Sequence, residues 1–167
     1  MNRLHRVPVL CLVVVAVGGG FFACKRQASP EKDMASRLVG TWEWKQSKVT
    51  QPTVIVLEMT AKGRYTETTC VETGGVRRVL YLKRSTGDLV AEPASADEIA
   101  KLKKSGFVAA IETGRFRVVV GEKTQSLVLE SDGPGGSREQ SLVIHSVNQI
   151  TIGGQIYQRQ GAATPAK

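Results

Sequence analysis

The sequence has few cysteines, few aromatic residues and no catalytic signature. Of its 167 residues, 3 are cysteines, 2 are Trp, 3 are Tyr and 4 are Phe, which excludes a disulfide-rich miniprotein. No Gly-x-Ser-x-Gly elbow, phosphate-binding loop, dinucleotide fingerprint or His-Glu-x-x-His motif occurs along the chain. The acidic residues are scattered and select no catalytic carboxylate pair. We therefore expect a protein that is not an enzyme and that holds no cofactor and no metal ion.

The first 23 residues instead have the pattern of a secretory signal. Arg3 and Arg6 precede an apolar run over residues 7–17 that only Pro8 interrupts, and three glycines follow it. Residues 7–23 are at the lower limit of length for a helix that spans a bilayer, and consecutive glycines disfavour such a helix. We expect residues 1–23 to be a signal peptide that is removed.

The end of this segment, Phe21-Phe22-Ala23-Cys24, resembles the lipobox of bacterial lipoproteins, in which a small residue precedes a cysteine that receives diacylglycerol. The resemblance implies lipidation of Cys24, with palmitate among its acyl chains, and attachment to a membrane. Lys25, in place of the Asp of an inner-membrane retention signal, favours the outer membrane, at its periplasmic face or at the surface. The alternatives are an uncleaved signal anchor and an ordinary secreted form.

Cleavage before Cys24 would leave 144 residues with 21 basic and 15 acidic side chains, a net charge of +6. We expect an anchored tether over residues 24–37, one folded domain over 38–160 and a disordered tail over 161–167. Cys70 would then be a lone thiol, which we interpret as a half-buried strand residue, and His145 alone makes no zinc site. The basic pairs are interpreted as solvated strand faces; an exported protein meets little nucleic acid, which leaves anionic lipid or surface polysaccharide as possible partners.

Within the domain, apolar residues alternate with polar ones with a period of two, and turn residues separate the runs. Eight to ten short strands in an antiparallel meander predict an all-β fold, a barrel or a sandwich. The predicted strands cover residues 40–47, 53–60, 63–71, 76–84, 107–112, 115–121, 125–131, 138–146, 149–153 and 155–160.

One segment departs from this alternation. Ser95 and Glu98 form a capping box, and Gly106 ends the segment, which predicts one short helix near residues 95–105. We expect this helix to close one end of the barrel. A movable ligand lid and a lysine-rich face that contacts anionic headgroups are the alternatives.

The first predicted strand carries Gly40-Thr41-Trp42, and Lys62-Gly63-Arg64-Tyr65 follows the second. This arrangement resembles the start of small bacterial lipocalin-like domains, whose first strand begins Gly-x-Trp. The resemblance implies a β-barrel whose Trp42 caps the closed end from inside. It also implies that an arginine near the last strand, here Arg159, packs over that tryptophan. Gly40, Trp42 and Arg159 are thus the predicted barrel floor.

Two hypotheses remain for the interior of such a barrel. An apolar cavity would make the protein a receptor or carrier for a small hydrophobic ligand. A filled core would make it an envelope interaction protein, with a protein partner of unknown identity, that binds through its outer surface. A connected cavity of a few hundred cubic ångströms distinguishes the two. The candidate lining residues are Trp44, Ile55, Leu57, Met59, Phe116, Val118, Leu127 and Leu129.

Overall fold

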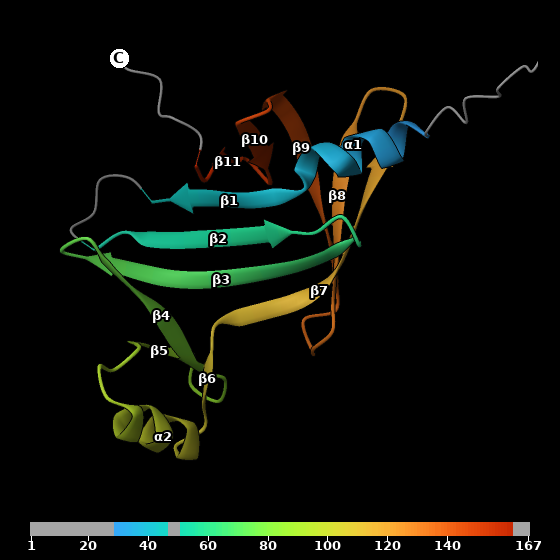
Figure 1. The fold of residues 1–167 in the computed structure, drawn as a ribbon. Helices are drawn as coiled ribbons and strands as arrows, with labels where there is room; N and C mark the ends of the chain where they lie inside the picture. The colour runs from blue at the N-terminus through green and yellow to red at the C-terminus, as the bar shows by residue number, and fades with distance from the viewer. Residues whose placement is uncertain (1–28, 47–50, 162–167) are drawn as a thin grey trace, which may run out of the picture.

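A computed structural model of the chain describes residues 29–46 and 51–161. The predicted signal peptide, the lipidation site Cys24 and residues 162–167 of the predicted tail lie outside these residues. The described part contains two short helices and eleven strands (Figure 1). These are α1 (Pro30–Leu38), β1 (Gly40–Lys45), β2 (Thr53–Met59), β3 (Arg64–Thr73), β4 (Val76–Lys83), β5 (Asp88–Ala91), α2 (Ala96–Lys104), β6 (Phe107–Ala109), β7 (Ile111–Val120), β8 (Gln125–Ser131), β9 (Ser137–Ser146), β10 (Gln149–Ile152) and β11 (Gln155–Arg159).

Eight of the strands close into an antiparallel barrel, which confirms the predicted fold class. Their order around the barrel is β2, β1, β11, β10, β9, β8, β7 and β3, and pairing between β2 and β3 completes the circle. In this register Trp42 on β1 lies between Leu57 on β2 and Arg159 on β11. The alternation seen in the sequence therefore directs one face of each strand into the barrel.

Side chains fill the interior of the barrel. Six of the eight candidate lining residues belong to one buried cluster, and the other two, Trp44 and Ile55, are partly buried against it. Leu57, Leu127 and Leu129 are at most 1% exposed. Such packing is that of a protein core. The cluster contains Leu38, Trp42, Leu57, Met59, Tyr65, Phe116, Val118, Leu127, Leu129, Leu142, Ile150, Ile152 and Tyr157.

One end of the barrel is closed by Trp42 and Arg159. Trp42 is fully buried, and its Nε1 donates a hydrogen bond to the Leu38 carbonyl at 2.7 Å. The guanidinium carbon of Arg159 lies 4.3 Å from the centre of the Trp42 ring, within cation–π distance. Gly40 has φ +138°, and a Cβ there would approach Arg159 Nη1 to 2.5 Å. Only glycine leaves room for this stacked arginine.

The guanidinium of Arg159 also donates three hydrogen bonds to main-chain carbonyls, which another side chain would not reproduce. The acceptors are Arg37, Val39 and Val147, each at 2.7 Å. Two of these carbonyls belong to the last residue but one of α1 and to its C-cap, where helical carbonyls lack partners within the helix. The arginine therefore joins the last strand to the C-terminal end of α1 and to the turn between β9 and β10.

Helix α1 was not predicted; it occupies residues that were assigned to the tether. Its start nevertheless has ordinary signals: Ser29 is the N-cap and accepts from the Lys32 amide, and Pro30 occupies the first turn. Met34 and Ala35 pack against the buried cluster. Consequently α1 covers the closed end of the barrel, and only residues 25–29 separate it from Cys24.

The second helix has the predicted capping box but not the predicted place. Ser95 Oγ accepts from the Glu98 amide, and α2 begins at Ala96. It contacts β6 and contains no buried residue, and Figure 1 shows it on the opposite side of the molecule from α1. The expectation that it closes the barrel was wrong. The reason is that β4 pairs with β3 only at the end of β3 and then leaves the barrel to pair with β5 and β6.

The observed strands also differ from the predicted ones. Strand β5 was missed, and the break predicted between the strands 107–112 and 115–121 lies inside the continuous strand β7. A Cβ at Gly114 would lie 2.1 Å from the Glu130 carbonyl oxygen and 2.6 Å from Tyr65 Cε1. Glycine here permits close packing between strands and does not mark a turn.

Replacement of Trp42 tests the closed end. Trp42→Ala should lower the free energy of unfolding by about 3 to 5 kcal/mol, because it removes a fully buried aromatic side chain. Trp44→Ala, at a partly buried position of the same strand, should lower the free energy of unfolding clearly less. Equilibrium urea unfolding of both variants measures this, and a loss below about 1 kcal/mol for Trp42→Ala would contradict the role of the residue.

Candidate functional site

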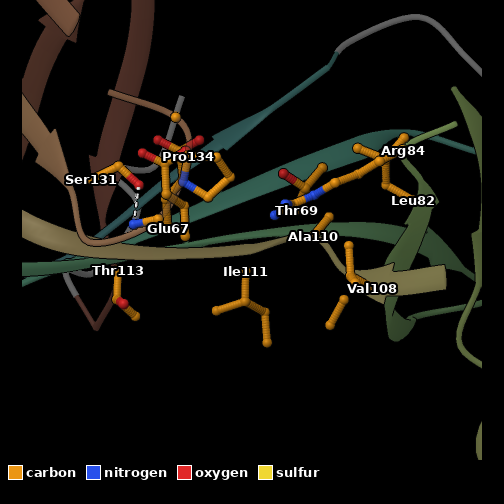
Figure 2. A pocket seen from close by; sticks show the side chains of 14 residues that line it. Glu67, Thr69, Leu82, Arg84, Val108, Ala110, Ile111, Thr113, Ser131 and Pro134 are labelled. Atoms are coloured by element: carbon orange, nitrogen blue, oxygen red, sulfur yellow. Dashed lines mark hydrogen bonds between the residues drawn. The ribbon is translucent and has the colours of Figure 1, made fainter. Parts of the chain in front are cut away.

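A hollow of about 550 Å³ lies at the open end of the barrel, away from α1. It is bounded by β3, β6, the start of β7 and the turn between β8 and β9. Figure 2 shows Glu67 and Pro134 at one end and Leu82 and Arg84 at the other, with Thr69 and Ala110 between them. We call this space, with its lining, the mouth hollow.

Beside the mouth hollow, the inward-facing side chains are charged and no longer apolar. Glu67 on β3 pairs with Glu112 on β7, and Arg138 on β9 pairs with the buried Leu129. Because side chains alternate along a strand, Glu67 lies on the same face as Tyr65. Three strands thus direct two carboxylates and one guanidinium to the inward face where the core ends.

These groups are linked by hydrogen bonds. Arg138 Nη2 donates to Glu67 Oε2 at 3.0 Å and to Glu112 Oε1 at 3.2 Å. Tyr65 Oη donates to the same Glu112 oxygen at 2.5 Å. Arg138 Nε is buried and has no partner among the described residues. One guanidinium thus binds two carboxylates. The side chains of Arg138, Glu67 and Glu112 together carry one negative charge. We call them the mouth triad.

The pKa values near the triad follow from burial and from these bonds. Burial alone would lower the pKa of Arg138, but the charges of Glu67 and Glu112 outweigh it and raise that pKa. Burial, followed by the hydrogen bond to Glu112, raises the pKa of Tyr65 to about 12. Burial, followed by the charge of Glu67, raises the pKa of Tyr157 to about 12. Both phenols therefore stay protonated, and Tyr65 remains a donor.

The rest of the mouth hollow is largely apolar. Leu82, Val108, Ile111 and Pro134 line it together with the small residues Ala109 and Ala110. Arg84 stands at the end away from the triad (Figure 2) and makes no ion pair with the described residues. The hollow therefore combines an acidic end, an apolar wall and a basic end.

The residues that the sequence singled out lie elsewhere. The candidate lining residues belong to the barrel core or pack against it, as described above. Cys70 is buried, which raises the pKa of its thiol, and His145 is exposed, with Nε2 2.8 Å from Thr151 Oγ1. The described residues contain no group of three His, Cys, Asp or Glu side chains placed to hold a metal ion. Neither α1 nor α2 is long and apolar enough to span a membrane.

No protein-family model matches the chain, and neither a curated protein nor a solved structure matches it.

The two buried phenols predict a loss of stability at high pH. Their pKa values are raised from 10.0 to about 12, so the folded state binds these protons more tightly than the unfolded state. The resulting stabilisation is complete below pH 10 and is lost as the pH rises toward about 12. Urea unfolding across this range should show a fall that the double variant Tyr65→Phe, Tyr157→Phe makes shallower. Identical slopes for both proteins would contradict this assignment.

Proposed function

We propose that this chain is an exported, lipid-anchored β-barrel of the bacterial cell envelope that binds its partner at the mouth hollow. The observation that carries the proposal is the division of the barrel into a filled interior and an open, chemically mixed mouth. The signal pattern and the lipobox-like Cys24 support export and anchoring. Lys25, which follows Cys24 in place of an inner-membrane retention Asp, favours the outer membrane.

The filled interior favours the second of the two hypotheses that the sequence left open. A carrier for a hydrophobic compound needs space between side chains such as Leu57 and Leu127, and these pack in one core cluster. The hollow lies instead beside Glu67 and Glu112. Two carboxylates that share one guanidinium suit a partner with polar or charged groups better than a hydrocarbon chain.

The short link to the anchor supports this role for the mouth. Lipidation at Cys24 leaves residues 24–29 before α1, and six extended residues reach roughly 20 Å. Because α1 covers the closed end of the barrel, that end would face the membrane. The mouth hollow, at the other end, would then face away from the membrane and be accessible to a partner.

We propose binding and not catalysis. In the described part of the chain, the carboxylates at the mouth are hydrogen-bonded to Arg138 and Tyr65. His145 and Cys70 do not line the mouth hollow. A nucleophile with an adjacent general base, which hydrolytic chemistry requires, is therefore not assembled from these groups at the mouth.

Replacement of the anchoring cysteine tests the location. Cys24→Ala should release the protein from the membrane fraction of cells, whereas Cys70→Ala should leave it membrane-bound. Fractionation measures the distribution, and mass spectrometry of the mature N-terminus detects the acyl chains. Continued membrane attachment of Cys24→Ala would mean that the uncleaved apolar segment is the anchor.

A further inference from the structure

We infer that the partner of the mouth hollow is an extended polypeptide segment that adds a strand beside β6 and the start of β7 and places one cationic group against the mouth triad. This inference rests on the proposed function, because it names the ligand class of the same hollow. It depends on an unpaired sheet edge, on the charge of the triad and on the apolar wall.

The sheet edge is left open where β8 ends. Strand β7 pairs with β8 only from Gly114 onward, while β6 pairs with β4 on its other side. The last bond along this edge runs from the Asp132 amide to the Thr113 carbonyl at 2.8 Å. Before Thr113 the edge has no pairing strand among the described residues.

The direction of the main-chain groups shows which of them face the open edge. The amide of Ala110 donates to Leu80, and its carbonyl accepts from Thr69, so both groups point toward β3 and β4. Hydrogen-bonding groups of successive strand residues point to alternate sides. The amides and carbonyls of Ala109 and Ile111 therefore point to the open edge, and both residues line the hollow. An extended peptide could pair with them.

This edge lacks two of the features that usually prevent such pairing. Exposed edges in stable proteins commonly carry proline or lysine, and residues 107–113 contain neither. Val108 and Ile111 are instead 41% and 48% exposed. These apolar side chains flank the open edge and would contact alternate side chains of an added strand.

The mouth triad specifies one cationic group on the peptide. Its net charge is negative, and Glu67 is only 18% exposed, so water screens that charge incompletely. Glu67 Oε1 and Glu112 Oε2 accept no hydrogen bond from the described residues. A lysine or arginine side chain, or a free amino terminus, would supply both the missing charge and the missing donors.

The turn between β8 and β9 leaves the Glu112 carboxylate accessible. A Cβ at Gly135 would lie 3.5 Å from Glu112 Oε2 and 3.3 Å from Ser131 Oγ. Gly135 does not have a positive φ, so the backbone itself does not require glycine there. Its small size keeps open the space between the turn and Glu112.

The test uses the lipid-free Cys24→Ala chain and three pentapeptides. The probe is acetyl-Thr-Val-Lys-Val-Thr-amide; one control has norleucine in place of lysine, and the other carries N-methyl groups on both valines. Amide NMR shifts are followed up to about 5 mM peptide, which detects millimolar dissociation constants. We expect the probe to shift Ala109 and Ile111, and each control to bind at least about tenfold more weakly because it lacks the charge or the donors.

Two protein variants complete the test. Glu112→Gln should weaken binding of the lysine peptide to the level of the norleucine peptide. Glu139→Gln, which changes an exposed carboxylate on β9, should not change binding. Absence of shifts at Ala109 and Ile111 at about 5 mM peptide would overturn the inference, as would equal binding of the N-methylated peptide.

A second measurement separates failure of the inference from failure of the proposed function. Compounds that co-purify with the protein from the cell envelope are compared between Val108→Trp, which fills the hollow, and Val143→Trp, at a similarly exposed site on β9. Loss only in Val108→Trp together with no peptide binding would overturn the inference and leave the mouth as the binding site. Equal retention in both variants would contradict binding at the mouth itself.

Discussion

The contact between Arg159 and Trp42 is the constraint on which the rest of the fold depends. The arginine belongs to the last strand and the tryptophan to the first, so their stacking fixes the junction where the barrel closes. The same guanidinium bonds the C-terminal carbonyls of α1. Gly40 provides the space that this arrangement needs. Closure of the sheet and coverage of its end therefore depend on one side chain.

The charged interior side chains lie at the end of the barrel opposite the closed one. The core ends at Glu67, Glu112 and Arg138, where interior strand positions carry charge. At the same end β4 leaves the barrel. Strand β8 ends opposite Gly114, so the first residues of β7 have no partner on that side. The unpaired edge and the uncompensated charge thus occur together at this end of the barrel. The proposed binding role follows from this asymmetry between the two ends.

The sequence predicted those parts of the fold that have local patterns. Alternation predicted most strands, and the capping box at Ser95 predicted α2. The stacking of Arg159 on Trp42 has the geometry that the lipocalin-like resemblance implied. Helix α1 was missed because its residues are mostly polar, although Ser29 followed by Pro30 is a typical helix start.

The mouth was not predicted because its residues are distant in the sequence. Arg138 lies 71 positions from Glu67 and 26 from Glu112, and only the strand register brings them together. One sequence signal could have indicated the mouth. Glu67 and Arg138 occupy the inward positions of strands in which apolar and polar residues alternate, and charged residues are unusual at such positions. The place of α2 could not be inferred either, since it depends on the point at which β4 separates from β3.

The most direct test of a filled barrel is a titration with a fluorescent fatty acid. Trp44→Phe leaves Trp42 as the one tryptophan of the chain, buried at the closed end of the core. Addition of cis-parinaric acid should produce no saturable energy transfer from Trp42, because the side chains around it leave no room for an acyl chain. Saturable transfer with one fatty acid per protein would show a specific fatty-acid site and contradict the account.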